Sequence, residues 1–197
     1  EERIIVITQP SQINVNAGSN KTITCSNDTV TLQGSSNVEN ATYLWTTQNG
    51  VIVSGANTLT PTVSESGMYT LTVINEDTEC TNSDTVQVGK DITKPTLVLT
   101  SSATELNCDV TSIVLDASES TGGNNFYWNV GGQNSSSITV TEPGTYYVSY
   151  SKNSNGCRVS KKIVITQNIE GTVAIITGNE DLTCSTTSVT LDASSST

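Results

Sequence analysis

The chain repeats itself, and this internal repeat strongly limits the folds that it can adopt. Segments that begin at Cys25, Cys108 and Cys184 align without gaps as "CSNDTVTLQGSS", "CDVTSIVLDASES" and "CSTTSVTLDASSS". In each copy, apolar residues occupy the fifth and seventh positions after the cysteine, which is the alternation of a half-buried strand. A tryptophan follows twenty positions after the first two cysteines, at Trp45 and Trp128. The repeat therefore predicts units built from strands.

The second half of each unit aligns from another pair of cysteines, Cys80 and Cys157. Each is preceded by a Gly-x-Tyr motif, in "VSESGMYTLTV" and "VTEPGTYYVSY", and each is followed by a short apolar strand, "TVQV" or "KIVI". The interval from tryptophan to tyrosine is six residues longer in the first unit, which accounts for the whole difference in cysteine spacing. A loop or a short edge strand in this interval tolerates such a change in length.

The repeat also predicts the division of the chain. The segment "IIVITQ" at residues 4–9 nearly duplicates "KIVITQ" at 162–167, the last strand of a unit. We therefore expect residues 1–9 to be the last strand of a preceding repeat and residues 169–197 to be the first strands of a following, incomplete repeat. Two complete β-sandwich repeats, at 10–91 and 92–168, lie between them. The sequence is thus interpreted as a window on a longer array.

Each complete unit is predicted to be a Greek-key β-sandwich of about seven short strands. Turn signals such as "TGGNN", "GGQN", "EPG" and "NSNG" separate the apolar segments of the second unit, and no stretch has sustained helical periodicity. The strands of that unit are expected near 96–100, 112–117, 125–130, 137–141, 145–151 and 157–166, with one further edge strand. A unit of about 80 residues has a small core, so a disulfide is expected to add about 2–4 kcal/mol.

The aromatic residues are expected to anchor the cores. Trp45 and Trp128 lie on predicted strands, and Tyr69 and Tyr146 begin an alternating strand directly after a turn. We interpret these four as core anchors, with the tyrosines as buried corner residues. A platform on which sugars stack is the alternative for the tryptophan strands.

Composition excludes several classes of function. The 8 basic and 19 acidic residues give a formal net charge of −11, which argues against nucleic acid and anionic membranes as partners. No segment has 18 consecutive apolar residues, so membrane insertion is not predicted. Histidine is absent, which removes the commonest general base, and no paired carboxylate motif recurs. We therefore predict no enzyme activity, no catalytic residues and no cofactor.

The five cysteines are widely spaced, which in a strand-rich chain predicts disulfides and an oxidising, extracytoplasmic location. Because each complete unit holds one cysteine of each type, we expect the bonds Cys25–Cys80 and Cys108–Cys157. By the same rule, Cys184 is expected to pair with a cysteine of its own unit that lies downstream, outside the chain. Four cysteines allow three pairings, and ours requires the "TITC" and "ELNC" segments to run beside the last strand of each unit.

A calcium site at the unit junctions is a second hypothesis for the acidic residues, because calcium prefers carboxylate and carbonyl oxygens. The first unit has Gln33 where the others have an aspartate, and no DxDxDG motif occurs, so the main prediction is no metal site. The candidate ligands are Asp116, Asp192, Glu142, Asp91 and Glu170.

Taken together, "VTLDASSST", a tryptophan strand, "TVTEPGTYYVSYS" and a closing "NGC" resemble the PKD-like and Ig-like repeats of giant Bacteroidetes cell-surface adhesins, of which the gliding-motility adhesins are the best known. The resemblance covers both complete units and both ends. The chain departs from true PKD domains because the stretch WxFGDG is missing after each tryptophan. The resemblance implies Ig-like or PKD-like sandwiches, export to the bacterial cell surface, often through the type IX system, and service as stalk or adhesive repeats.

The segments between units are short, "GKDITKP" and "QNIEG", and have none of the composition of a flexible spacer. We therefore expect a stiff, extended stalk whose main partners are neighbouring repeats of the same chain. Surface glycans and the secretion or motility machinery are further candidate partners. Two other functions stay open: a carbohydrate- or surface-binding module, and a fibre subunit that completes its neighbour by strand donation.

Overall fold

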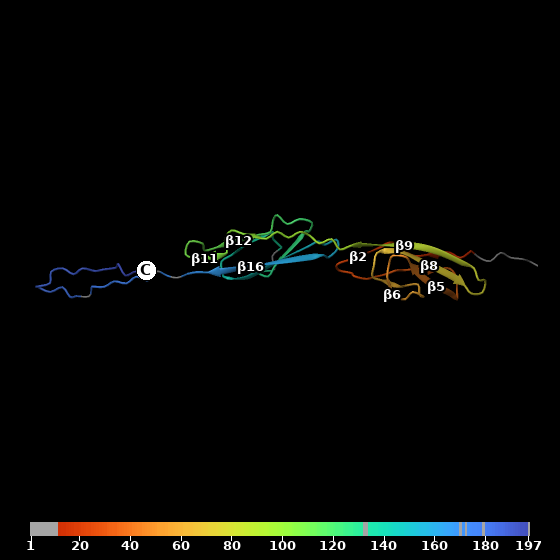
Figure 1. Ribbon diagram of the computed structural model, residues 1–197, viewed down its shortest axis with the longest axis horizontal. Coiled ribbons are helices and arrows are strands. Elements are labelled where there is room, and N and C mark those ends of the chain that lie inside the picture. Colours follow the sequence, from red (N-terminus) through yellow and green to blue (C-terminus); the bar gives the residue numbers. More distant parts are fainter. Residues whose placement is uncertain (1–11, 132–133, 170, 172, 179, 197) are drawn as a thin grey trace, which may run out of the picture.

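The protein is described from a computed structural model, which places residues 12–131, 134–169, 171, 173–178 and 180–196. The described residues form strands, turns and loops, with no helix among them, as the alternating sequence predicts. None of them belongs to a helix long and apolar enough to span a bilayer. Figure 1 shows two sandwiches arranged end to end, followed by an extended C-terminal segment.

The first sandwich consists of two packed sheets. One sheet has the order β2-β9-β8-β5 and the other the order β3-β7-β6, while β1 pairs with β4. The bounds are β1 Val15–Asn16, β2 Lys21–Thr24, β3 Val30–Thr31, β4 Ser35–Ser36, β5 Ala41–Thr47, β6 Ile52–Ser54, β7 Thr62–Val63, β8 Gly67–Asn75 and β9 Thr81–Asp91. This is the two-layer arrangement of immunoglobulin-like sandwiches.

The second sandwich repeats the plan with orders β11-β16-β15-β13 and β10-β12-β14. Its bounds are β10 Thr100–Ser101, β11 Glu105–Leu106, β12 Ile113–Asp116, β13 Asn125–Trp128, β14 Ser137–Val140, β15 Gly144–Ser151 and β16 Arg158–Gln167. The segment expected as a strand at 96–100 forms an isolated bridge at Thr96 and joins β10 at Thr100. Between them the Ser120 side chain takes the place of a backbone partner for Val98.

The six extra residues of the first unit contain β6. This strand lies at the edge of its sheet, where it pairs antiparallel with β7 across a register shift. In the described part of the second unit, the corresponding sheet ends at β14. The length difference is thus absorbed at a sheet edge, where insertion leaves the core unchanged.

One pairing decides where the ends of each unit lie. β2 runs parallel to β9, with Thr24 opposite Asp91, and β11 runs parallel to β16 in the equivalent register, with Leu106 opposite Gln167. The segments that precede Cys25 and Cys108 therefore do run beside the last strand, and they run in its direction. Each of these cysteines consequently lies where the last strand ends.

Each sandwich has its own apolar core. Trp45 is 2% exposed and Trp128 is fully buried, and their indole Nε1 atoms donate hydrogen bonds to the carbonyls of Thr58 and Ser135, at 2.8 Å and 2.9 Å. The cores share aliphatic neighbours at equivalent positions, such as Leu32 and Leu115. The tryptophans are therefore packing residues between the sheets, and they offer no open face for a sugar.

The two Gly-x-Tyr motifs form buried corners. The Tyr69 hydroxyl donates to the Glu65 carbonyl at 2.6 Å, and the Tyr146 hydroxyl donates to the Glu142 carbonyl at 2.7 Å. Both bonds reach back four residues along the chain, as in the tyrosine corner of immunoglobulin-like domains. The Tyr69 hydroxyl also accepts a bond from the Val51 amide at 3.0 Å, so the longer first unit ties its extra loop to this corner.

We expect Tyr69→Phe to lower the free energy of unfolding by about 2 kcal/mol and Tyr146→Phe by about 1 kcal/mol, because the first loses two hydrogen bonds and the second one. Urea unfolding followed by tryptophan fluorescence measures both. Tyr127→Phe is the control, since Tyr127 is 60% exposed. Equal stabilities for all three variants would contradict the corner assignment.

The C-terminal segment keeps the repeat's local structure without its core. Leu182 and Leu191 are 68% and 66% exposed, whereas their counterparts Leu106 and Leu115 are buried in the second sandwich. Thr177 and Asp192 nevertheless form an antiparallel bridge. The apolar pattern of the opening strands is present here, but the strands that cover it in a complete unit are not packed on it.

Candidate functional site: the junction between the two sandwiches

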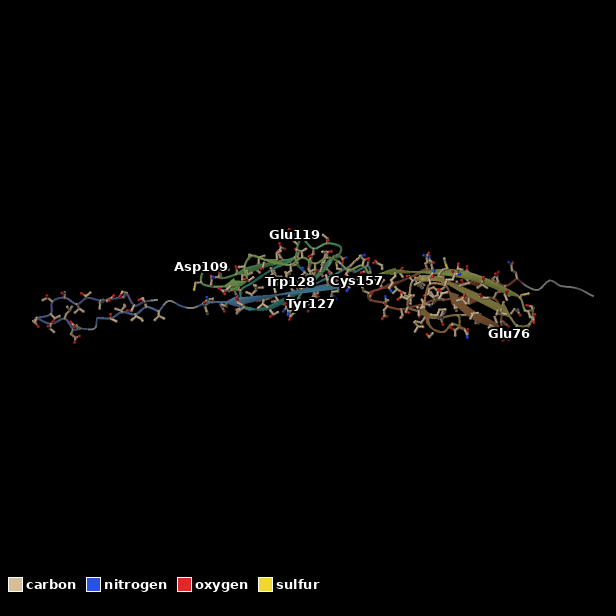
Figure 2. The ribbon with its side chains drawn as sticks, viewed as in Figure 1. Glu76, Asp109, Glu119, Tyr127, Trp128 and Cys157 are labelled. Carbon is tan, nitrogen blue, oxygen red and sulfur yellow. A yellow bond between two sulfur atoms is a disulfide. The ribbon has the colours of Figure 1, made fainter. Side chains whose placement is uncertain are left out.

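The structure joins Cys25 to Cys157, across the junction between the sandwiches, with 4.9 Å between their Cα atoms. Cys80, Cys108 and Cys184 are free thiols. The expected bonds Cys25–Cys80 and Cys108–Cys157 are therefore wrong. Figure 2 shows Cys157 at the boundary where the two sandwiches meet.

The parallel pairing explains why neither expected bond forms. Cys25 follows Thr24, which lies opposite the last residue of β9, whereas Cys80 precedes the first residue of β9. A strand of this length spans about 33 Å. Cys108 and Cys157 are separated in the same way by β16. A disulfide requires Cα atoms within about 7 Å, so the two cysteines of one unit cannot meet.

The same geometry brings Cys25 and Cys157 together. The chain leaves the first sandwich at the end of β9, where Cys25 lies, and enters the second sandwich directly afterwards. The β15–β16 hairpin of the second sandwich turns back at this entry point and carries Cys157. Two cysteines from adjacent units, 132 residues apart in sequence, thus face each other across one short linker.

On the first sandwich, Cys25 lies in a tight turn that we call the opening turn, residues 24–27. The amides of Thr24 and Asn27 each donate to the other residue's carbonyl, at 2.9 Å and 3.2 Å. The Thr24 hydroxyl also accepts a bond from the Asn27 amide at 3.2 Å. The turn is therefore held by its own hydrogen bonds, and it presents the cysteine to the next sandwich.

On the second sandwich, Cys157 ends the hairpin loop that we call the closing loop, residues 152–157. The Lys152 amide donates to the Cys157 carbonyl at 2.9 Å, and the Gly156 amide donates to the Lys152 carbonyl at 2.8 Å. Gly156 has φ 69°, in the left-handed region, and a Cβ added there would lie 2.6 Å from the Cβ of Ser26. The backbone conformation favours glycine here, and the close approach of the opening turn leaves no room for a side chain.

We expect Gly156→Ala to slow the formation of the Cys25–Cys157 bond during refolding in a glutathione buffer by about tenfold. The added methyl group raises the energy of the closed junction by about 1–2 kcal/mol through steric contact and the left-handed backbone. Quenched thiol counting measures the rate. Gly171→Ala is the control, because a Cβ there meets nothing within 4 Å. Equal rates for the two variants would contradict the assigned contact.

Asn155 is the polar residue at the centre of the junction and is 1% exposed. Its side-chain Nδ2 donates to Oδ1 of Asp91 and to the carbonyl of Thr93, both at 3.0 Å. Its Oδ1 accepts the Cys157 amide at 3.0 Å, and its own carbonyl accepts the Ser26 amide at 3.3 Å. One side chain thereby connects the closing loop, the linker and the opening turn.

Asp91 receives these bonds from the linker side. The hydrogen bond from the Asn155 side chain, followed by those from the Thr93 amide and the Lys152 ammonium, lowers the pKa of Asp91 from 3.8 to about 2. The Lys152 Nζ lies 3.3 Å from Oδ2 of Asp91, and both side chains are partly exposed. The junction thus favours the ionised carboxylate.

We expect acid to loosen this junction between about pH 4 and pH 2. The pKa of Asp91 is lower in the folded junction than in the unfolded chain, so its contribution is complete above the unfolded value and is lost as the pH falls through the folded value. Fluorescence energy transfer between dyes on the two sandwiches, in the reduced protein, follows the opening. Asp91→Asn removes this titration. An unchanged acid transition in that variant would show that Asp91 does not cause the opening.

The structure does not bring the five calcium candidates together. Asp91 accepts hydrogen bonds within the junction. Asp116 accepts hydrogen bonds from the amide and hydroxyl of Ser118, and Asp192 accepts the equivalent bonds from Ser194. These bonds lower the pKa of each carboxyl. Glu142 contributes its carbonyl to a tyrosine corner, and Glu170 lies outside the described residues. Among the described residues, no group of three His, Cys, Asp or Glu side chains is placed to hold a metal ion.

Sequence reasoning missed Asn155 and the partner of Cys157. The segment "NSNG" predicts a turn, and nothing in it indicates that one asparagine is buried against another unit. The deciding feature is the parallel direction of the opening segment, which the structure shows and which places Cys25 and Cys80 at opposite ends of a unit. With that direction known, a bond across the junction follows.

Comparisons with known proteins show a similarity to immunoglobulin domains over the first unit. A sequence model of the immunoglobulin domain matches residues 5–89. No curated protein matches the chain. Similar solved structures include murine CEACAM1b, at 17% identity, 80% coverage of this chain, 100% of that chain and a TM-score of 0.33. The D00-D0 domain of intimin is 15% identical, with 78% of this chain and 99% of that chain covered and a TM-score of 0.34. Titin domains Z1Z2 in complex with telethonin are 10% identical, with 83% of this chain and 100% of that chain covered and a TM-score of 0.35.

The fold of both units agrees with this similarity. The first unit has two sheets, a buried tryptophan between them and a tyrosine corner, and its opening segment pairs with the last strand. The second unit has each of these features at equivalent positions. The chain therefore contains an immunoglobulin-like domain followed by a second sandwich of the same kind.

Proposed function

We propose that the chain is a structural segment of a large filamentous cell-surface adhesin, in which it acts as a stiff stalk. The observation that carries the proposal is the junction. Cys25–Cys157 and the Asn155 hydrogen bonds link the sandwiches by covalent and polar contacts on both sides of a linker that is only a few residues long. A ligand-binding domain on a flexible tether has no need of such a fixed junction.

The same observation supports a tension-bearing role. The bond encloses residues 26–156, which include most of both sandwiches. A pull applied along the chain passes from Cys25 to Cys157 and bypasses this loop. The load then passes along β2 and β16, which are already extended, and the residues inside the loop are shielded from it.

A surface location is part of the proposal. The disulfide requires an oxidising compartment, which for a bacterial protein lies outside the cytoplasm. The acidic surface also suits a soluble, extended protein that resists self-association. The resemblance to giant Bacteroidetes adhesins extends the proposal to export by the type IX system and to surface adhesion or gliding motility. The repeats then have a structural role and catalyse no reaction.

Small-angle X-ray scattering of the oxidised chain tests the stalk. A compact fold of this length has a radius of gyration of about 16 Å, whereas two sandwiches end to end with a C-terminal segment give about 30 Å. We expect the larger value, and we expect it to persist when the concentration is changed. The radius of a compact fold would rule out the stalk.

A second candidate function is carbohydrate binding, favoured by one surface of the second sandwich. Tyr127 and Tyr147 are 60% and 47% exposed there. Tyr127 also lines a shallow cavity of about 340 Å³ with Asn125, Phe126, Asn134, Ser149, Ser151 and Arg158. The first unit has Leu44 and Thr70 at the two tyrosine positions, so this surface is not repeated. Binding on a glycan array that is lost in Tyr127→Ala would support it.

A further inference from the structure

The unpaired cysteines of the two sandwiches, Cys80 and Cys108, lie at the ends of the sandwiches that face away from the junction. Cys108 follows β11, where β16 ends, and Cys80 precedes β9 at the far end of the first sandwich. Figure 2 marks these ends by Asp109, next to Cys108, and by Glu76, in the loop that leads to Cys80. Cys108 follows its opening strand as Cys25 does, and Cys80 precedes its last strand as Cys157 does.

The turn that carries Cys108 has the conformation of the bonded opening turn. The Asn107 amide donates to the Val110 carbonyl at 3.0 Å, as Thr24 does to Asn27. The Asn107 side chain accepts the Val110 amide at 2.7 Å, in the role of the Thr24 hydroxyl.

The turn at residues 183–186, which carries Cys184, has the same structure. The Thr183 amide donates to the Thr186 carbonyl at 3.0 Å, and the Thr183 hydroxyl accepts the Thr186 amide at 3.0 Å. Three opening turns thus have one geometry, and only that of Cys25 has a partner sandwich docked on it.

The loop that carries Cys80 likewise has the conformation of the bonded closing loop. The Asn75 amide donates to the Cys80 carbonyl at 2.9 Å, as Lys152 does to Cys157 at the same distance. Glu79 has φ 56°, matching Gly156 with φ 69°. The Cys80 amide reaches the Thr78 hydroxyl at 3.5 Å, where the Cys157 amide reaches the Asn155 side chain.

We propose that Cys108 and Cys184 on one side, and Cys80 on the other, are half-sites for disulfides to further sandwiches of this kind. The opening cysteine of each repeat bonds the closing cysteine of the next repeat, as Cys25 bonds Cys157. The occupant of the Cys108 half-site is therefore the closing loop of another repeat. This inference rests on the proposed stalk function and specifies how the stalk is linked.

The rule changes the expected partner of each free cysteine. A partner in the same repeat is ruled out, because the last strand keeps the two cysteines of one repeat apart. The observed separation is 132 residues, so the partners of Cys108 and Cys184 lie about that far along a continuing array. Because Cys80 and Cys108 both lie inside the loop closed by Cys25 and Cys157, successive loops overlap, and the array is held by interleaved bonds.

Each bond forms by thiol–disulfide exchange with a disulfide oxidant, such as oxidised glutathione or a thiol oxidoreductase. The Cys108 thiolate attacks the oxidant, forms a mixed disulfide and releases one thiol. The closing cysteine's thiolate then attacks the sulfur of Cys108 and releases the second thiol. Two cysteine thiols are oxidised to one disulfide, their two protons pass to the two leaving thiolates, and one oxidant disulfide is thereby reduced to two thiols.

One difference between the closing loops provides a sharp test. Glu79 stands where Gly156 stands at the observed junction, and a Cβ at that position approaches the opening turn to 2.6 Å. Thr78 likewise replaces the buried Asn155. The double variant T78N/E79G gives the Cys80 loop the "NGC" sequence of the docked loop. A second copy carrying this loop then supplies the occupant that the proposal specifies.

The experiment incubates the full chain, as wild type and as T78N/E79G, at about 1 mM in a glutathione redox buffer and maps the linked peptides without reduction. We expect links from Cys80 to Cys108 or Cys184 to exceed links between two opening cysteines by about tenfold in the double variant. We also expect their yield to be several-fold higher than in wild type. Random pairing would give equal amounts of the two classes, since there are two opening cysteines and one closing cysteine.

Equal amounts of the two classes, or three thiols that remain glutathione adducts in both proteins, would overturn the proposal. Thr78→Ala/Glu79→Ala is the matched control and should not raise the yield, because alanine restores neither the glycine nor the asparagine amide. The stalk hypothesis is judged separately, by scattering from the monomer. An elongated monomer with random links would refute the half-sites and leave the stalk intact.

Discussion

Reduction of one disulfide should lengthen the pulled chain by roughly 450 Å, which is the extended length of the loop that the bond closes. With handles at its two ends, the oxidised protein carries load through Cys25 and Cys157, and residues 26–156 cannot extend. At about 3.3–3.6 Å per residue, the 132-residue separation corresponds to that length. Single-molecule force spectroscopy before and after addition of dithiothreitol measures the change in contour length.

Two variants make this test specific. Cys25→Ser/Cys157→Ser should show the long extension without any reductant, because it lacks the bond. Cys184→Ser should behave like the wild type in both conditions, since Cys184 is exposed and unbonded. If the oxidised and reduced proteins reach the same contour length, the bond across the junction does not carry the load and the tension-bearing role is wrong.

Asn155→Ala should destabilise the junction, because it removes the side chain that connects the closing loop, the linker and the opening turn. The substitution removes two donated bonds, to Asp91 and Thr93, and leaves the buried Cys157 amide without its partner. Buried polar groups that lose their partners typically cost about 2–4 kcal/mol in total. We expect the free energy of unfolding to fall by that amount, measured by urea denaturation.

A second readout separates the junction from the fold of the second sandwich. Dithiothreitol should reduce Cys25–Cys157 at least about tenfold faster in Asn155→Ala, because the loosened loop exposes Cys157, which is fully buried in the wild type. Asn153→Ala is the matched control in the same loop. Its backbone amide, which donates to Asn124, survives the substitution. Equal reduction rates in both variants would show that Asn155 does not hold the junction.

The fold could be predicted from the sequence because its signals are local and repeated. The alternation around Leu32 and Leu115, the turn before each corner tyrosine and the position of each tryptophan recur in two units, so each unit supports the interpretation of the other. The edge strand β6 was also anticipated, since an insertion that leaves both cores intact has to lie at an edge. These features depend on which residues are apolar and how they are spaced, and both are visible in the sequence.

The pairing of cysteines could not be predicted in the same way. Counting one cysteine of each type per unit favours Cys25–Cys80, and the spacing is compatible with it. The direction of β2 relative to β9 decides the matter, because parallel pairing places the two thiols at opposite ends of a strand of about 33 Å. Strand direction depends on contacts between residues far apart in sequence, which a local pattern does not encode.

The sequence by itself determined the repeat, the all-β class, the core aromatics and the absence of histidine. Only the tertiary structure decided that Cys25 bonds the following sandwich, that Asn155 is buried at that junction and that Asp91 is held ionised there. The physical reason is the same for all three. In each sandwich the strand that precedes the opening cysteine, β2 or β11, runs parallel to the last strand, so the two cysteines of a sandwich lie at opposite ends and face its neighbours.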